Sequence, residues 1–326
     1  MPDLVTVDDI RRAAERVRGI VVRTPLVPYP EQNPPLLIKP ESLQPIGAFK
    51  LRGAHATLSG IPAESRRGVI AHSSGNHAQA VAYVARALGV PAVIVMPETT
   101  SQVKVERTRR LGAEVVFSPP SNEARRRRAE ELAAERSYVY VPPFDDERVI
   151  AGQGTVGLEI VEDAPDVDVV LVPVSGGGLV SGVAVAVKAL NPRAKVVGVE
   201  PELAADARDS FHKGTRVAWS TESTGRTLAD ALRTDQVGER TFPHIQRYVD
   251  DMLAVGEDEI REAMRRLARN ARLVAEPGGA VAVAASLFRR DELPPGRQVA
   301  VLSGGNVEPS LLAEVVGSPK PYVETG

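Results

Sequence analysis

The segment Val167-Asp168-Val169-Val170-Leu171-Val172-Pro173-Val174-Ser175-Gly176-Gly177-Gly178-Leu179 carries the clearest fold signal in the chain. Its first half is apolar and β-branched, which is typical of a strand buried in the middle of a parallel sheet. Three consecutive glycines follow, and an apolar helical pattern then continues to Leu190. A second strand pattern, Lys195 to Glu200, comes directly after that helix. The order strand, helix, strand predicts a βαβ unit whose turn is residues 175–178.

Short apolar runs alternate with longer helical patterns through most of the 326 residues. This alternation predicts an α/β fold in which helices cover both faces of parallel sheets. Further strands are predicted at residues 68–71, 92–96, 114–117, 138–141 and 299–303, and helices at 78–88, 101–111, 122–136 and 260–273. We therefore expect two open, twisted parallel-sheet lobes with a cleft between them. The large lobe would contain residues 1–45 and 146–326, and the small lobe residues 46–145.

The composition excludes several classes of function. The formal net charge is -2, so no overall basic field attracts nucleic acid or anionic membrane. There is no cysteine, which excludes disulfides and thiolate chemistry and is compatible with the cytosol. Residues 1–4 lack the pattern of a secretory signal, and no apolar stretch reaches the roughly 20 residues of a membrane span. We expect a soluble, cytoplasmic protein that binds neither nucleic acid nor membrane.

The turn of residues 175–178 is a candidate anion site. Glycines let the backbone approach an anion, and the helix start supplies free N–H groups and a favourable dipole. A plain tight turn is the alternative. The turn is not a P-loop, because no Lys-Ser or Lys-Thr follows, and Ser181 replaces the third glycine of a dinucleotide fingerprint. The literal G-x-G-x-x-G match at residues 152–157 has no convincing strand before it, so we interpret it as a chance match at a helix start.

A second polar segment, Ser73-Ser74-Gly75-Asn76-His77, lies at a predicted strand-to-helix junction. Its hydroxyls, amide and imidazole suit a substrate carboxylate or a cofactor hydroxyl. Simple N-capping is the alternative, although it explains one polar residue rather than a run of them. A serine hydrolase elbow is excluded, because Ala71 stands where that motif requires glycine.

Lys50 lies in Pro45-Ile46-Gly47-Ala48-Phe49-Lys50-Leu51-Arg52-Gly53-Ala54. By itself it resembles an ordinary surface lysine at a helix start. A further glycine-bearing segment, Ser303-Gly304-Gly305-Asn306, follows the last predicted strand. An amine combined with several backbone cradles is what a phosphate-bearing aldehyde cofactor needs. The combination therefore points to pyridoxal phosphate.

Two charged segments have competing interpretations. Glu200-Pro201-Glu202-Leu203-Ala204-Ala205-Asp206 follows a strand, and its carboxylates and carbonyls suit a hard divalent cation. From spacing alone, a solvated acidic loop is the simpler interpretation. The arginines at 125–128 alternate with glutamates on a predicted helix, which is typical of a solvent-exposed helix face.

Taken together and in this order, these segments resemble the fold-type II pyridoxal-phosphate enzymes, the family of serine/threonine dehydratases and serine racemase. The resemblance spans nearly the whole chain and implies a tryptophan synthase β-like fold. It implies that Lys50 is the Schiff-base lysine and the base, and that Ser74 lies on the opposite face of the substrate. Asn76 would bond the ring hydroxyl, and Ser303 would face the pyridine nitrogen. The implied cofactor-binding residues are Phe49, Lys50, Asn76, Ser175, Gly176, Gly177, Gly178, Leu179, Glu276 and Ser303.

Two details are similar to the serine racemase-like branch. One is the segment His72 to His77, and the other is the match of Glu200, Ala204 (through its carbonyl) and Asp206 to that branch's divalent-cation site. The resemblance thus implies Mg²⁺ or another divalent cation. The implied substrate-binding residues are Ser73, Ser74, Asn76, His77 and Arg125. Ala48 and Ser175 depart from the family pattern, which usually has serine and glycine at these positions.

The resemblance implies a dehydratase (ammonia-lyase) that converts a β-hydroxy amino acid of serine, threonine or 3-hydroxyaspartate type to a 2-keto acid and ammonia. A serine is a weak partner for the pyridine nitrogen, so loss of the β-hydroxyl competes well with storage of the carbanion. The alternative is a serine or aspartate racemase, or one protein with both activities, because both reactions begin with loss of the Cα proton. A catalytically silent cofactor-binding protein is a third possibility, against which the intact Lys50 argues. We also expect a homodimer.

Overall fold

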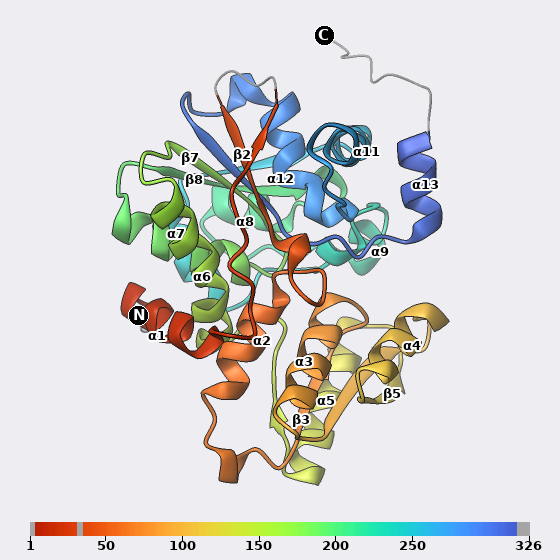
Figure 1. Cartoon of the computed structure of the whole chain (residues 1–326). Coiled ribbons are helices and arrows are strands. Elements are labelled where there is room, and N and C mark those ends of the chain that lie inside the picture. Colours follow the sequence, from red (N-terminus) through yellow and green to blue (C-terminus); the bar gives the residue numbers. More distant parts are fainter. Residues whose placement is uncertain (1–3, 31–34, 318–326) are drawn as a thin grey trace.

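The computed structural model describes residues 4–30 and 35–317 and has two lobes, each built on its own sheet (Figure 1). No helix within these ranges is long and apolar enough to cross a membrane. Residues 1–3 of the N-terminal segment considered above lie outside the described part of the chain.

The larger sheet has six strands in the order β1-β2-β10-β7-β8-β9. Its strands are β1 (Val27–Tyr29), β2 (Leu36–Pro40), β7 (Val169–Pro173), β8 (Lys195–Pro201), β9 (Asp251–Val255) and β10 (Gln298–Leu302). All neighbouring strands are parallel except β1 and β2. In the register of β2 with β10, Lys39 lies opposite Val301. A strand from the beginning of the chain therefore pairs with the last strand of the chain.

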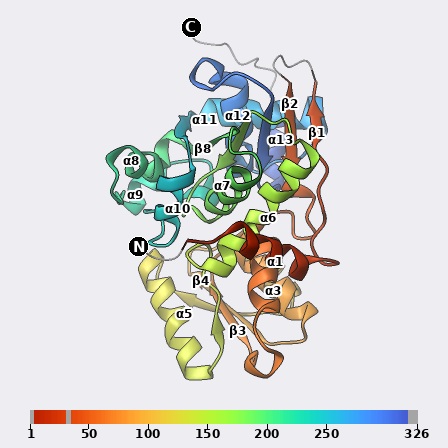
Figure 2. The same ribbon diagram turned by 90° about the vertical axis from the view of Figure 1, so that its left-hand side faces the viewer.

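Two helical layers cover this sheet, and their contacts explain its continuous apolar strands. Leu37 and Val170 pack on one face against α6 (Glu147–Asp163) and α7 (Gly178–Leu190). Leu36 and Leu171 pack on the other face against α11 (Glu257–Arg266) and α12 (Pro277–Phe288). The N-terminal helix α1 (Val7–Val17) packs on α6 (Figure 2).

The smaller sheet is entirely parallel, in the order β5-β4-β3-β6. Its strands are β3 (Val69–His72), β4 (Ala92–Pro97), β5 (Glu114–Ser118) and β6 (Val139–Tyr140). Helices α2 (Lys50–Ser59) and α3 (Asn76–Ala87) share one core with it, α4 (Gln102–Arg110) joins that core through Val105, and α5 (Asn122–Arg136) packs on the opposite face. Helix α2 also contacts α6 of the larger lobe, so the helix that begins at Lys50 lies between the two sheets.

The remaining helices are α8 (Asp206–Lys213), α9 (Thr221–Thr224), α10 (Thr241–Tyr248) and α13 (Pro309–Gly317). They pack mainly on helices and strands of the larger lobe: α10 contacts α7, α8 contacts β8 and β9, and α13 contacts α11. Short turns of helix are η1 (Glu41–Leu43), η2 (Ala63–Ser65), η3 (Glu202–Ala204), η4 (Asp230–Leu232), η5 (Leu267–Ala271) and η6 (Arg290–Glu292).

The predicted fold class, two parallel-sheet lobes of an α/β protein, is confirmed. The glycines at 152–157 lie inside α6, as the interpretation of a chance match requires. They allow close helix packing, because a Cβ at Gly152 would lie 2.7 Å from the Cα of Gly53 in α2. The lobe boundaries after residues 45 and 145 stay a prediction.

Candidate active site

Lys50 is the first residue of α2 and lies beside the carboxyl end of β10. The Phe49 N–H donates to the Ser303 carbonyl at 3.0 Å, and Ala48 pairs with Gly304 in an isolated bridge. The Lys50 amine donates to the Pro143 carbonyl at 2.7 Å and lies 5.0 Å from the centre of the Phe49 ring. Enclosure of this amine lowers the pKa of Lys50 to about 8, so a larger fraction is neutral than for an exposed lysine.

Asn76 begins α3 and faces Glu276, the residue before α12. Its Nδ2 donates to Oε1 of Glu276 at 2.6 Å, and its Oδ1 accepts from Nδ2 of Asn306 at 2.7 Å. Burial and the neighbouring Asp230 raise the pKa of Glu276 to about 7. The Glu276 N–H donates to the Gly304 carbonyl, so this hydrogen-bonded chain lies beside the Ser303 segment.

The segment Ser73 to His77 connects β3 to α3, as predicted. The Ser73 hydroxyl accepts the Gly75 N–H at 3.1 Å, and the side chain of Ser74 is half-buried. Nε2 of His77 lies 2.9 Å from the Val141 carbonyl oxygen. Burial and the nearby Lys50 lower the pKa of His77 to about 3, so its imidazole is neutral and bonded within the small lobe.

The glycine turn leads from β7 into α7, which begins at Gly178. Gly177 has a φ of 91°, a conformation that glycine adopts without strain. A Cβ on Gly178 would lie 3.1 Å from atoms of Phe144, so glycine also permits the packing of the turn. The Ser175 side chain turns to the Thr234 hydroxyl, with which it hydrogen bonds. The first N–H groups of α7 have no carbonyl partner within the helix, which leaves them available to an anion.

These residues fit pyridoxal phosphate. The structure offers an amine for the aldehyde, an amide for the ring oxygen, a serine near the same strand end and a helix start for the phosphate. The segment of Pro143 and Phe144 joins two of these parts, because Pro143 accepts from Lys50 while Phe144 packs on the glycine turn.

Arg125 lies on α5 near the predicted substrate segment. Its side chain bonds to Asn122, and its Nε is buried without a hydrogen-bond partner within the described ranges. Helix α5 contacts β3, the strand that ends at His72, and burial together with the charge of Arg125 lowers the pKa of His72 to about 4. Nδ1 of His72 lies 2.8 Å from the Tyr140 hydroxyl.

Glu200 and Asp206 lie at the carboxyl end of β8, and both are 0% exposed. Glu200 accepts the N–H groups of Ala207 and Arg208, whereas both carboxylate oxygens of Asp206 lack a partner among the described residues. Burial raises the pKa of Asp206 to about 8, and burial beside Asp206 raises that of Glu200 well above its usual range. Ala204 ends η3, two residues before Asp206. No group of three or more His, Cys, Asp or Glu side chains suited to a metal occurs in the described part of the chain.

An ion cluster behind Lys50 was not predicted. Arg52 is 0% exposed; its guanidinium bonds both oxygens of Glu41, at 2.7 and 2.8 Å, and both of Glu159, at 2.7 and 2.8 Å. Lys39, also buried, donates to Glu159 at 2.6 Å. Although burial alone would lower the pKa of Arg52, Glu41 and Glu159 raise it above its usual value. The cluster connects α2 to β2 and α6. The sequence feature that could have indicated it is Arg52, an arginine two residues after Lys50.

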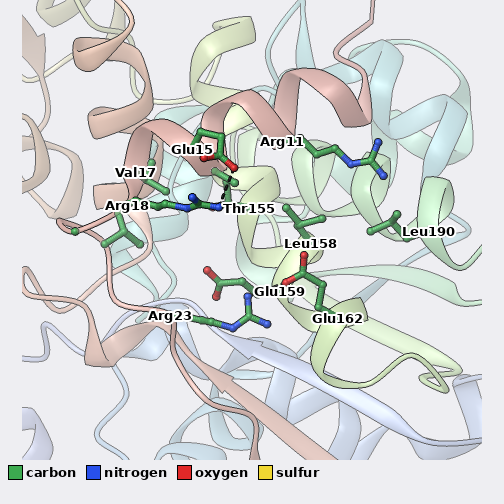
Figure 3. Close-up of a pocket in the computed structure, with 13 residues that line it drawn as sticks. Arg11, Glu15, Val17, Arg18, Arg23, Thr155, Leu158, Glu159, Glu162 and Leu190 are labelled. Carbon is green, nitrogen blue, oxygen red and sulfur yellow. Dashed lines mark hydrogen bonds and ion pairs between the residues drawn. The ribbon is translucent and has the colours of Figure 1, made fainter.

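Thr155 and Glu159 of α6 also form part of the wall of a cavity of about 450 Å³ beside α1 (Figure 3). None of the predicted site residues lines this cavity. Arg11, Arg18 and Arg23 around it are each ion-paired, with Asp8, Glu15 and Glu162 respectively. The cavity thus adjoins the ion cluster rather than the candidate active site.

Comparison with known proteins shows the family of the chain. The family model described as "Pyridoxal-phosphate dependent enzyme" matches residues 17–304. The chain belongs to this family of pyridoxal-phosphate-dependent enzymes, and its homologues are threonine ammonia-lyases and serine racemases.

Two curated relatives are ammonia-lyases. The chain is 41% identical to the L-threonine ammonia-lyase of Thermotoga maritima over 99% of this chain and 80% of the relative. It is 40% identical to the L-threo-3-hydroxyaspartate ammonia-lyase of Saccharomyces cerevisiae over 95% of this chain and 96% of the relative.

Two solved structures share the fold closely. The T.th. threonine deaminase has a TM-score of 0.88 at 42% identity, and the match covers 93% of this chain and 99% of that one. Maize serine racemase has a TM-score of 0.89 at 34% identity, and the match covers 96% of this chain and 97% of that one. The chain is therefore similar in structure both to a deaminase and to a racemase.

Proposed function

We propose that this protein is a dehydratase that converts a β-hydroxy amino acid, of the threonine, serine or 3-hydroxyaspartate type, to a 2-keto acid and ammonia. The observation that supports it most is the amine of Lys50, which lies beside the Ser303 strand end. Two relatives are named as ammonia-lyases of L-threonine and of L-threo-3-hydroxyaspartate, and these names support the same class of reaction.

The residues of this site divide the work. When bound, pyridoxal phosphate withdraws electrons from the substrate Cα and makes its proton acidic. Lys50 is the base for that proton, and its lowered pKa favours the neutral form that can accept it. Ser73, Asn76 and Arg125 would bind and orient the substrate, with the neutral His77 supporting their segment. Loss of the β-hydroxyl as water, followed by hydrolysis, gives the keto acid and ammonia.

A keto-acid assay across threonine, serine and 3-hydroxyaspartate, with and without Mg²⁺, tests this function. We expect keto acid from at least one of these substrates, in equal amount with ammonia. Bound cofactor without keto acid from any β-hydroxy amino acid would contradict the proposal and favour a racemase or a binding protein.

The alternative is racemisation of serine or aspartate by the same site. It is supported by the similarity to maize serine racemase and by the half-buried hydroxyl of Ser74. In this alternative, Lys50 removes the Cα proton from one face, and Ser74 returns a proton from the other.

Replacement of Ser74 by alanine separates the two reactions. Because elimination needs no proton from the Ser74 face, we expect the variant to lose racemisation about 10²-fold or more while keto-acid formation falls less. Chiral chromatography of recovered substrate, run beside the keto-acid assay, measures both. Equal loss of the two activities would contradict this division of roles.

We also propose that Glu200, Asp206 and the carbonyl of Ala204 bind Mg²⁺ or a similar cation, together with water. Both carboxylates are buried and have raised pKa values, and the Asp206 carboxylate has no hydrogen-bond partner among the described residues. Because buried carboxylates need a compensating partner, these observations support a bound cation at this position.

Mg²⁺ should therefore raise the thermal unfolding temperature of the protein. At a concentration 100 times the Kd, the expected stabilisation is about 2.7 kcal/mol. Asp206→Asn should remove the response, whereas Asp209→Asn, on the half-exposed side of α8, should retain it. An Asp206→Asn protein that responds to Mg²⁺ like the parent would place the cation elsewhere.

From the resemblance to the fold-type II family, we also propose that the protein is a cytoplasmic homodimer. Its lobes would divide after residues 45 and 145. Light scattering of the cofactor-loaded protein tests the dimer, and a molar mass equal to one chain would contradict it.

A further inference from the structure

We infer that Asn306 is a positioning residue for the cofactor, which acts by fixing the amide of Asn76. The Ser303 to Asn306 segment was predicted to contribute only Ser303. In the structure, the side chain of Asn306 contacts two segments of the site: the loop before Lys50, at Ile46, and the start of α3, at Asn76.

Both hydrogens of the Asn306 amide have defined acceptors. Nδ2 donates to the Ile46 carbonyl at 2.8 Å and to Oδ1 of Asn76 at 2.7 Å. Its own Oδ1 lies over Gly47, where a Cβ would approach it to 2.8 Å; Gly47 has a φ of 73°. The glycine therefore leaves the space that the Asn306 amide occupies.

These contacts decide which end of Asn76 faces the cofactor. Since Asn306 has only donors on this side, the atom of Asn76 that meets it must be the oxygen. The Asn76 amide nitrogen then points the other way, where one hydrogen is donated to Glu276 at 2.6 Å. Its second hydrogen has no acceptor among the described residues and would bond the ring oxygen of pyridoxal phosphate. A reversed amide would set its oxygen against the Glu276 carboxylate and its N–H groups against those of Asn306.

The same side chain couples Asn76 to Lys50. Ile46 lies four residues before Lys50, and the Gly305 N–H donates to the Gly47 carbonyl at 2.9 Å. The side-chain amide of Asn306 thus fixes two things at once: the loop that leads to Lys50, and the amide of Asn76. The two would contact the cofactor at neighbouring positions, the aldehyde and the ring oxygen.

Asn306→Asp is the sharpest test, because it keeps the shape and removes both donors. We expect the Kd for pyridoxal phosphate to rise about tenfold, as for loss of a hydrogen bond to a charged or buried partner. We also expect the visible absorbance band of the bound cofactor to shift, since its position depends on the hydrogen bond to the ring oxygen. Both are measured by titrating the cofactor-free protein. Asn306→Ala, which adds no charge, replaces the aspartate variant if that protein does not fold.

Asn191→Asp is the matched control. Asn191 also donates its Nδ2 to two backbone carbonyls, Pro165 at 3.3 Å and Val167 at 3.0 Å, but at the end of α7 away from the candidate site. Its variant should leave Kd and absorbance unchanged. A general loss of loop order would instead affect both variants.

The inference rests on the proposed role of Asn76, so the Asn76→Ala background is included. In that background, Asn306→Asp should cause no further absorbance shift, because the amide that it orients is gone. A normal absorbance and Kd in Asn306→Asp, or a full shift that persists in Asn76→Ala, would overturn the role of Asn306 alone. Unchanged cofactor binding by Asn76→Ala would overturn both this inference and the proposed site.

Discussion

Replacement of Lys50 by alanine is expected to abolish keto-acid formation. The loss should reach about 10²–10⁴-fold or more, because the variant removes the general base as well as the covalent attachment of the cofactor. The position of Lys50 is fixed by the bond of the Phe49 N–H to the Ser303 carbonyl and by the bond of the Lys50 amine itself to the Pro143 carbonyl. Lys50→Arg should be equally inactive, since a guanidinium is not deprotonated in proteins.

Keto-acid release and the visible absorbance of the bound cofactor measure this result together. Lys195→Ala provides the control: that side chain is 52% exposed, pairs with Asp250 at the protein surface and should show parental activity. Full keto-acid production by Lys50→Ala would rule out the proposed reaction at this residue.

Arg52→Met is expected to produce the largest loss of folding stability, about 3–5 kcal/mol. The substitution leaves the carboxylate of Glu41, itself 0% exposed, without its cation. Glu159 would keep only Lys39 as a partner in the cluster. Breaking a buried ion pair from one side costs far more than the pair contributes as a whole, because the remaining charge stays desolvated.

Equilibrium urea unfolding of the cofactor-free protein measures this cost. Arg52→Met combined with Glu41→Gln should recover part of the lost free energy, since the unpaired charge is removed. Arg23→Ala breaks ion pairs at a side chain that is 50% exposed and should cost no more than about 1 kcal/mol. A similar cost for Arg52→Met and Arg23→Ala would show that the buried cluster does not stabilise the fold more than an exposed ion pair does.

The strongly periodic parts of the fold were predictable from local sequence. The helix predicted at residues 122–136 has those bounds in the structure, and the strand and glycine turn around Gly177 lie as expected. Strand β2 was missed because Lys39 and Pro40 interrupt its apolar pattern. Lys39 is buried there with its amine bonded to Glu159 of the ion cluster and to the Thr24 carbonyl. The helix predicted at residues 260–273 instead ends at Arg266 and continues as a π turn, which no sequence signal marked.

In the candidate site as well, residues in local motifs were predictable, whereas their partners from distant sequence were not. Lys50, Asn76 and Ser303 stand in recognisable motifs, and the structure brings them into one region. The partners that orient them come from distant sequence: Arg52 meets Glu159 across 107 residues, and Asn306 meets Asn76 across 230. Such pairs have no local pattern, because each partner alone looks like an ordinary polar residue.

The pairing of β2 with β10 has a consequence for the order in which the protein forms during synthesis. All four strands of the smaller sheet have been made once residue 140 is complete, so that sheet can assemble early. The larger sheet must wait for residues 298–302, which at typical translation rates arrive roughly ten seconds or more later. Until then, the apolar surfaces of β2 and β7 lack the strand that lies between them. The nascent chain is therefore most exposed to aggregation and to chaperones in this interval, with one lobe formed and the other open.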